Sequence, residues 1–359
     1  MNVTSQRALK ATRQKKKNAV KKDAVTIGID TAKSVFQIHG VDEDGNVVLR
    51  RRVKRNRFIE FMAQLPTAIV GIEATGASHH WARELIKFGH DVRLMNPKRV
   101  KAYRDSDKSD RNDADAICEA VSRKRMKFIA VKTLDQQGMQ GLHRGRSRLM
   151  KNRTALVNQA RGLLSECGIV MHKGIRVFRS ELPEILDEQA GSIPEILRVM
   201  LLEMYDELIV LDKQIEKFDK QFERLTDADP MCRKLKKVKG IGPLTALALV
   251  SKIGDANIFN GSREMSSYFG LAPQECSSGE KKHMFGISKR GDRYIRTLLI
   301  HGARSVVWKA SGKDDSLSRW INKIKDKSGP NVAAVALANK NARIVWALMT
   351  KDEEYREAT

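Results

Sequence analysis

The chain has 359 residues, which is too many for one ordinary domain and enough for two or three domains with cores of their own. Hydrophobic residues make up 41% and charged residues 31%, so a largely disordered chain is excluded. The formal net charge of +24 indicates a polyanionic partner, because lysines and arginines that neutralise phosphates release condensed counterions. Ribosomal and chromatin-like proteins carry a similar excess, so charge alone predicts nucleic acid and no particular chemistry.

The cysteines and the apolar runs of the sequence indicate the cellular compartment in which the protein is expected. Cys118, Cys167, Cys232 and Cys276 stand far apart, in no zinc-binding spacing and at too low a density for a disulfide framework, as in a reducing cytosol. No apolar run approaches the roughly 20 residues that a bilayer-spanning helix needs. The basic N-terminus lacks the apolar stretch of a signal peptide. We therefore expect a soluble intracellular protein without a membrane partner.

Residues 1–24 are expected to form a disordered basic arm. Residues 1–22 contain eight lysines and arginines and no acid. Like charges repel one another, so this segment should stay extended and contact nucleic acid. The alternative is a tail that only improves solubility.

Residues 25–126 alternate between short apolar runs and amphipathic stretches. Strands are expected at Val25–Asp30, Ser34–His39, Val47–Val53, Ala68–Glu73 and Asp91–Met95, and helices at Arg57–Leu65, His79–Phe88 and Lys108–Arg123. Three strands in a row, followed by helix, strand, helix and strand, is the order of an RNase H-like core. The sequence therefore predicts an α/β domain of the RNase H-like (RuvC-like) class, with a mixed sheet covered by helices.

Residues 127–229 are predicted to be helical and to carry a coiled coil. Apolar residues recur at steps of four and three over about four heptads, at Leu197, Leu201, Met204, Leu208, Leu211, Ile215, Phe218, Phe222 and Leu225. Leu142, Leu149, Leu156 and Leu163 repeat every seven residues before a break at 168–192. A coiled coil would make this the oligomerisation region, giving a dimer or a tetramer. The alternative is a long helix packed within its own chain.

Residues 230–350 are predicted to form a mostly α-helical third domain, and 351–359 a polar tail. An apolar helix ends at Ile253, further helices cover Asp292–Trp308 and Asn331–Met349, and a Gly/Ser-rich loop runs from Gly270 to Gly291.

Four carboxylates are the strongest chemical candidates. Asp30 and Glu73 end strands that are neighbours in an RNase H-like sheet, and Asp110 and Asp113 share one face of the following helix. Four acids brought together would repel one another, and Mg²⁺ or Mn²⁺ would remove that repulsion. Two such ions can stabilise both oxygens of a phosphoryl transfer. Asp107 has the same spacing to Asp110, but its place near the helix start favours a role in stabilising the helix dipole.

A second candidate site is the Gly/Ser-rich loop, where Ser277 and Ser278 precede a cluster of cations. The cations are Lys281, Lys282, His283, Lys289, Arg290, Arg293 and Arg296. A serine here would lie against a phosphate, and the arginines could stabilise the added negative charge of a pentacovalent transition state. The sequence shows no local base for the hydroxyl. A basic loop that merely binds phosphate explains the spacing equally well.

Four motifs in fixed order resemble one known family. They are Gly28-Ile-Asp30-Thr-Ala-Lys33, Gly71-Ile-Glu73-Ala-Thr-Gly76, Lys108-Ser-Asp110-Arg-Asn-Asp113-Ala, and Gly270-Leu-Ala-Pro273 through Ser278-Gly279 to Lys289-Arg-Gly291. In this combination the chain resembles the DEDD transposases of bacterial insertion sequences, the Piv/MooV-like recombinases of the IS110 family. The basic arm departs from many members, which start almost at the first strand.

The resemblance implies specific roles. Asp30, Glu73, Asp110 and Asp113 would be the metal-binding tetrad, and Ser278 the nucleophile of a C-terminal transposase domain, with Ser277 as the neighbouring alternative. It also implies a serine-type recombinase guided by a structured non-coding RNA from the element's own end. Such an enzyme would act on donor and target DNA as a homo-oligomer, in the bacterial cytoplasm at the nucleoid.

Two other functions remain open at this point. In a RuvC-like nuclease or junction resolvase, the carboxylates would activate water and the serine loop would only bind phosphate. A non-catalytic nucleic-acid-binding scaffold would use the arm and the coiled coil alone. The scaffold leaves the four acids unexplained.

Overall fold

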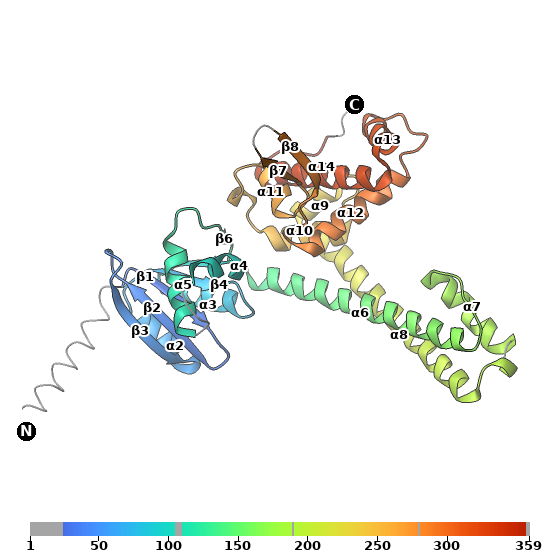
Figure 1. The fold of residues 1–359 in the computed structure, drawn as a ribbon, viewed down its shortest axis with the longest axis horizontal. Helices are drawn as coiled ribbons and strands as arrows, with labels where there is room; N and C mark the ends of the chain where they lie inside the picture. Colours follow the sequence, from blue (N-terminus) through green and yellow to red (C-terminus); the bar gives the residue numbers. More distant parts are fainter. Residues whose placement is uncertain (1–23, 105–109, 189, 279–280, 357–359) are drawn as a thin grey trace, which may run out of the picture. The chain divides into compact units, whose positions relative to one another are not determined.

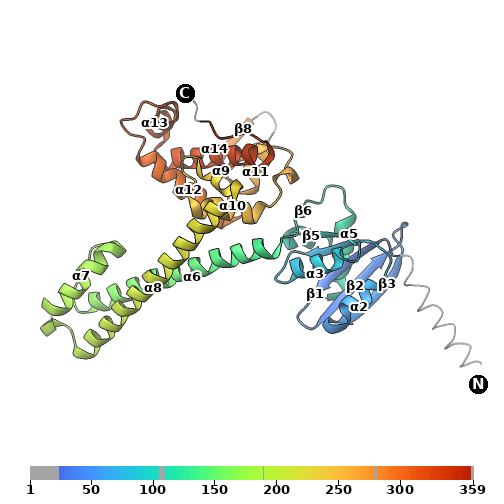
Figure 2. The ribbon, with the colours of Figure 1, turned by 180° about the vertical axis from the view of Figure 1, so that it is seen from behind.

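The structure, a computed structural model, describes residues 24–104, 110–188, 190–278 and 281–356. The chain divides into two compact units, residues 1–133 and 134–359, which are treated separately below. Figures 1 and 2 show the ribbon from opposite sides. The predicted basic arm, apart from its last residue, and the end of the polar tail lie outside the described residues.

The first unit is built on a six-stranded sheet. Its strands are β1 (Thr26–Thr31), β2 (Val35–Val41), β3 (Val47–Lys54), β4 (Ile69–Glu73), β5 (Asp91–Met95) and β6 (Phe128–Ile129). The spatial order is β3-β2-β1-β4-β5-β6, with β1, β4 and β5 parallel and the remaining pairs antiparallel. This mixed sheet confirms the predicted α/β class and is compatible with an RNase H-like domain. The sequence reasoning missed the two-residue strand β6.

Helices cover both faces of this sheet. They are η1 (Arg55–Arg57), α2 (Phe58–Ala63), α3 (Ser78–Ile86), α4 (Pro97–Val100), η2 (Lys101–Tyr103) and α5 (Asp110–Ser122). On one face, Phe36, Phe58 and Trp81 pack edge-to-face with ring centroids 4.5–5.3 Å apart, over Ile27 and Ile29 of β1. Since side chains alternate along a strand, Gly28 of β1 points to the opposite face, where α5 lies.

Two glycines let α5 press directly onto the sheet. Gly28 and Gly71 are paired across β1 and β4. A Cβ atom on Gly28 would lie 2.8 Å from the Cα atom of Cys118 and closer still to the carbonyl oxygen of Ala114. A Cβ atom on Gly71 would lie 2.8 Å from the Cβ atom of Val121. The backbone of α5 therefore lies directly on Gly28, and at Gly71 the side chain of Val121 occupies the space that a larger residue would need.

The second unit begins with a long helical hairpin. It contains α6 (Leu134–Glu166), α7 (Ile175–Glu188), η3 (Ala190–Ser192) and α8 (Glu195–Ala228). Ion pairs join Arg146 to Asp219 at 2.5 Å and Arg153 to Asp212 at 2.8 Å, so α6 and α8 run antiparallel. Both views show the two helices side by side.

The predicted heptad seam of α8 faces its own chain. Leu201, Leu208, Leu211 and Ile215 are buried in one cluster with Leu149 and Leu156 of α6 and Phe178 of α7. Helix α8 thus packs this seam against helices of the same chain. This is the alternative that the sequence left open, a long helix packed within its own chain. An intermolecular coiled coil stays a prediction.

The remainder of this unit is a helical bundle around one core. Its elements are α9 (Pro230–Lys236), α10 (Pro243–Ile253), η4 (Ala256–Ile258), α11 (Ser262–Tyr268), β7 (Pro273–Ser278), β8 (Lys281–Ile287), α12 (Arg293–Trp308), α13 (Ser316–Ser328) and α14 (Pro330–Thr350). The mostly helical character predicted from the sequence is confirmed. His143 attaches α6 to this bundle: its ring stacks on Phe222, and its Nδ1 lies 3.0 Å from the Tyr294 hydroxyl. In the described part of the chain, no helix has the length and apolarity needed to cross a bilayer.

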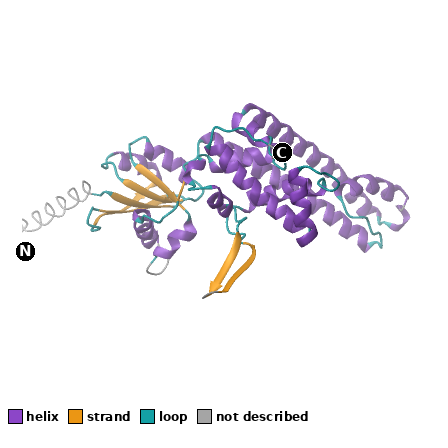
Figure 3. Ribbon diagram, turned by 90° about the horizontal axis from the view of Figure 1, so that it is seen from above, coloured by secondary structure: helices purple, strands orange, loops and turns teal. Residues whose placement is uncertain are grey.

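One prediction for this region was wrong. The stretch 270–291 is not a flexible loop, since β7 and β8 form an antiparallel hairpin, which Figure 3 shows extending from the helices of its unit. The glycines and serines of this stretch interrupt the alternation of apolar and polar residues by which a strand is recognised in a sequence. The ladder itself runs through Pro273–Ser278 and Lys281–Ile287, residues that are polar on both faces for much of their length.

The close approach of α5 can be tested by adding single methyl groups. Gly28→Ala should lower the free energy of unfolding of the first unit by at least about 3 kcal/mol, because the new methyl group meets backbone that cannot rotate away. Urea titration measures the loss, and hydrogen exchange in β1, β4 and α5 locates it. Gly76→Ala is the matched control in the same unit, since nothing lies within 4 Å of its added Cβ, and should change stability by no more than about 0.5 kcal/mol. Equal stability of the two variants would contradict the packing described.

Candidate active site

Asp30 and Glu73 are placed side by side by the register of two parallel strands. Ile29 of β1 pairs with Ile72 of β4, and the two acids are the next residue on each strand. Each acid stands two residues after the glycine that α5 covers, so it lies on the face of the sheet that carries α5. The carboxyl ends of two adjacent parallel strands thus present two acids to one helix.

The helix α5 supplies a third acid. Asp113 precedes Ala114, whose carbonyl oxygen lies over Gly28. Burial raises the pKa of Glu73, and the negative charges of Asp30 and then Asp113 raise it further, while the nearby Arg104 lowers it. These three carboxylates are therefore close enough to interact electrostatically.

The fourth predicted acid is located by its backbone alone. Asp110 is the first residue of α5, one turn before Asp113, and its side chain lies outside the described part of the structure. Asp107, the competing candidate, also falls outside the described residues. Three of the four proposed ligands are thus brought together, and the position of the fourth on the helix directs it to the same end of α5.

Arg104 is a functional candidate that the sequence reasoning missed. Its guanidinium forms an ion pair with Asp113, and the two side chains are only 20% and 14% exposed. Among the residues whose side chains are described, no three metal-ligating groups converge closely enough to enclose an ion. The guanidinium instead neutralises part of the carboxylate charge. Arg104 is close to the acids in the sequence, six residues before Asp110. No spacing rule links a loop arginine to a helical acid, so no signal in the sequence would have identified this role.

His39 is a second residue that the sequence did not reveal. It lies on β2, paired with Gly28, and is 3% exposed beneath α5. Its Nε2 atom lies 3.3 Å from Oδ1 of Asp115. This contact connects the sheet to α5 two residues beyond Asp113, so it helps to fix the rotation of the helix that carries the acids.

The donor chemistry of the carboxylate cluster fits a hard divalent cation. The acids Asp30, Glu73 and Asp113 offer only carboxylate oxygens, which Mg²⁺ and Mn²⁺ prefer. No cysteine thiolate is available nearby in ionised form, because burial raises the pKa of Cys118 to about 12. Zinc sites rely mainly on histidine nitrogen and cysteine sulfur ligands, which these three acids do not supply.

The second candidate site lies on the β7–β8 hairpin. Ser278 is the last residue of β7 and pairs with Lys281, while Ser277 pairs with Lys282. The side chains of 276–282 are outside the described part of the structure, so the register gives each candidate serine only its place on the backbone.

The predicted nucleic-acid-binding cations occupy different environments. Lys289, Arg290 and Arg293 are exposed around the start of α12. Arg296 instead donates a hydrogen bond to the backbone carbonyl of Phe269 at 3.0 Å, which holds the base of the hairpin. Lys281 and Lys282 are placed on β8 by their backbone only.

Asp292 organises the same region. It accepts a hydrogen bond from the backbone N–H of Ile295 at 3.0 Å, which caps α12, and it pairs with Lys252 at 2.8 Å. The pKa of Asp292 is lowered overall, because the contacts with Lys252 and the helix N–H groups outweigh the effect of burial. This acid is therefore engaged in holding the helix and is a poor candidate for a general base.

Comparison with known proteins identifies the family. A family model described as "Transposase", of the DEDD class named for IS110, matches residues 27–169, and the model "Transposase IS116/IS110/IS902 family" matches residues 232–317. The first match contains Asp30, Glu73, Asp110 and Asp113, and the second contains Ser278.

Full-length relatives agree with these matches. A probable family 20 transposase of Pseudomonas aeruginosa is 44% identical over 331 residues, covering 92% of this chain and 98% of the relative. The transposase for insertion sequence element IS1111A of Coxiella burnetii is 43% identical over 343 residues, covering 95% and 94%. The transposase for element IS1328 of Yersinia enterocolitica is 37% identical over 325 residues, covering 90% and 96%. The resemblance drawn from the motifs is confirmed at the level of the family. With its mixed α/β N-terminal unit and its mostly helical C-terminal unit, the chain belongs to the IS116/IS110/IS902 family of insertion-sequence transposases, enzymes that cut and rejoin DNA.

Proposed function

We propose that this transposase cuts and rejoins DNA by two cooperating sites. Asp30, Glu73, Asp110 and Asp113 hold Mg²⁺, for which Mn²⁺ can substitute, and Ser278 attacks a DNA phosphate. The observation that carries the metal site is the grouping of Glu73 with Asp30 and Asp113 at the end of adjacent strands, where their charges act on one another. Grouped acids without a cation would destabilise the fold, so their placement needs a chemical purpose.

The residues of the cluster have distinct tasks. A bound divalent cation supplies Lewis acidity to the phosphate oxygens. Asp30 and Glu73 hold their positions through the backbone ladder of β1 and β4, and Asp113 through the packing of α5 on Gly28. Arg104 pairs with Asp113 and offsets part of the carboxylate charge. A guanidinium in that place can turn toward a DNA phosphate when a cation takes over the neutralisation.

Removing one ligand tests the metal site. Asp30→Asn keeps the shape of the side chain and removes its charge, so metal-dependent DNA cleavage should fall on the order of a hundredfold or more. The affinity for Mn²⁺, measured by calorimetry, should fall about tenfold or more. Asp91→Asn is the matched control, since Asp91 is an exposed acid that starts β5 of the same sheet, at the opposite end from Glu73. Unchanged cleavage and Mn²⁺ binding in Asp30→Asn would refute this metal site and favour the non-catalytic scaffold.

The serine step conserves the number of phosphoester bonds. A bond forms between Ser278 Oγ and phosphorus as the bond between phosphorus and one sugar oxygen breaks. The serine proton leaves, and the departing sugar oxygen gains a proton. Attack of another strand's hydroxyl on the phosphoserine reverses these changes and seals the DNA without net hydrolysis. Lys289 and Arg290, both exposed near the hairpin, can stabilise the added negative charge.

A covalent protein–DNA adduct distinguishes this mechanism from a nuclease that uses water. The DEDD family match on its own fits nuclease-like chemistry, so the serine needs direct proof. Ser278→Ala removes the proposed attacking hydroxyl and should abolish the adduct seen after denaturing electrophoresis of a reaction on labelled DNA, while Ser277→Ala leaves that hydroxyl in place and should retain the adduct. Loss of the adduct in Ser277→Ala alone would move the assignment by one residue. Strand cleavage by Ser278→Ala at the wild-type rate would support the RuvC-like nuclease or resolvase with water as nucleophile.

We further propose a structured non-coding RNA and additional copies of the chain as partners. The charge of +24 exceeds what one short DNA contact needs, and α8 leaves a row of large apolar side chains exposed for another subunit. These side chains are Ile196, Val199, Met200, Leu202 and Val210.

Both partners can be measured on the purified protein. Treatment with ribonuclease should abolish recombination of a donor and a target plasmid, and RNA transcribed from the end of the element should restore it. Light scattering should give a mass of two or four chains, and Ile196→Asp should lower it. Full recombination after ribonuclease treatment would remove the guide RNA from the proposal, and a monomer that recombines DNA would remove the oligomer.

A further inference from the structure

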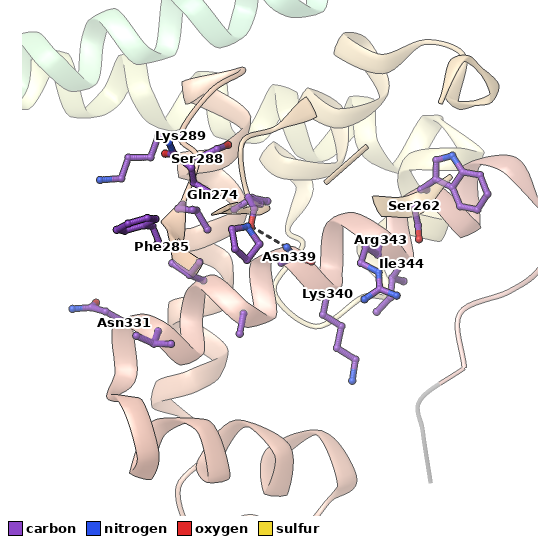
Figure 4. A pocket seen from close by; sticks show the side chains of 18 of the residues that line it. Ser262, Gln274, Phe285, Ser288, Lys289, Asn331, Asn339, Lys340, Arg343 and Ile344 are labelled. Carbon is purple, nitrogen blue, oxygen red and sulfur yellow. Dashed lines mark hydrogen bonds between the residues drawn. The ribbon is translucent and has the colours of Figure 1, made fainter. Parts of the chain in front are cut away.

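A large groove lies between the base of the β7–β8 hairpin and helix α14. Its volume is about 1380 Å³, and all of the residues that line it belong to the second unit. Figure 4 shows Phe285, Ser288 and Lys289 on one side of Asn339, and Lys340 and Arg343 on the other. Asn339 itself donates a hydrogen bond to the carbonyl oxygen of Leu271 at 2.9 Å, which ties α14 to the start of the hairpin. The groove is therefore a built feature of this unit and does not depend on the carboxylate cluster.

One stripe of α14 forms the length of the groove. Lining residues recur every four positions along the helix and beyond its end, at 331, 335, 339, 343, 347 and 351. A row of residues four apart turns about 40° around the helix at each step, so it follows a diagonal path over α14 and no single straight face. A lining that spans the helix in this way suits an extended chain better than a compact small molecule.

The charge of the groove is of one sign. Lys289, Lys340, Arg343 and Lys351 line it, and no aspartate or glutamate is among the described lining residues. Lys351 also pairs with Glu353, which lies outside the lining, at 3.8 Å. A lining with cations and no acid favours a polyanion, and the lysine and arginine side chains are long enough to follow a phosphate backbone.

The floor of the groove is aromatic and apolar. Phe285 is 59% exposed on β8, and Trp320 and Trp346 also line the groove. The ammonium group of Lys340 lies 4.8 Å from the centre of the Trp320 ring. Trp320 and Trp346 are partly buried against the core of the unit, so Phe285 is the ring open to a ligand. An exposed aromatic ring beside cations can stack an unpaired base, whereas a duplex keeps the faces of its bases hidden.

We propose that this groove binds an unpaired DNA strand, with bases stacked on Phe285 and phosphates paired with Arg343 and Lys340. The proposal deepens the proposed function, because residues 285–288 of the Ser278-bearing hairpin and the segment after it form one wall of the groove. A strand held at the base of the hairpin lies on the same element as the serine, which stands at the other end of β7. Recombination separates DNA strands, so a site for an unpaired strand on this hairpin would keep the cut end from diffusing away.

Equilibrium binding of the full-length protein tests the groove without any chemistry. Fluorescence anisotropy would compare a labelled single-stranded DNA with the duplex of the same sequence at fixed salt. Phe285→Ala should weaken single-strand binding about tenfold and change duplex binding less than about twofold, because only unpaired bases stack on the ring. Arg343→Ala should weaken single-strand binding by a similar factor. The slope of log affinity against log salt concentration should fall by the amount expected for the loss of about one phosphate contact. Both side chains are exposed, so the variants should fold normally.

Controls separate this proposal from the serine mechanism. Lys313→Ala removes an exposed cation that does not line the groove and should bind single strands as the wild type does. Ser278→Ala should also retain the binding, so loss of its adduct and loss of groove binding are independent results. Equal weakening of duplex and single-strand binding, no effect of Phe285→Ala, or a single-stranded RNA of the same sequence bound more tightly than the DNA would each overturn the proposal of an unpaired DNA strand.

Discussion

The close packing of α5 on the paired glycines Gly28 and Gly71 is the constraint on which the candidate metal site depends. Because the backbone of α5 rests on Gly28 and the side chain of Val121 packs onto Gly71, Asp113 comes within electrostatic range of the two acids that follow those glycines by two residues. A residue with a Cβ atom at either position would lift the helix and widen the spacing of the acids. The motif Gly-x-acid occurs in both β1 and β4. Its glycine lets α5 pack closely on the sheet, and its acid supplies a carboxylate to the candidate metal site.

Electrostatic repulsion is the cost of this arrangement, and neighbouring residues limit it. Arg104 pairs with Asp113, and its charge opposes the rise in the pKa of Glu73 that burial and the other acids cause. On the far side of the same helix, His39 approaches Asp115. The carboxylate cluster thus has a guanidinium beside Asp113 and a buried imidazole beside Asp115, two groups of different chemical type along one helix.

The sequence predicted the first unit well because period-two apolar runs report directly on strands. Strand β5 was predicted with its bounds as found, and β1, β3 and β4 to within one residue. Asp30 and Glu73 could be proposed together because they end such strands. Arg104 and His39 could not, since their roles arise from contacts between residues that no periodic pattern connects. The β7–β8 hairpin was missed because its ladder is rich in serine, lysine and glycine, which are usually found in loops. Likewise, a heptad seam cannot indicate whether its partner helix belongs to the same chain.

The antiparallel packing of α6 on α8 bears on how the enzyme is made. Each newly synthesised chain can close its long helices on itself, through Leu201, Leu208 and their neighbours, without waiting for a second copy. Closing this hairpin is then independent of protein concentration, whereas the proposed oligomer would form in a second, concentration-dependent step. Under that proposal, an element that expresses its transposase sparingly would accumulate folded single chains, and the frequency of its movement would rise more steeply than the amount of protein present.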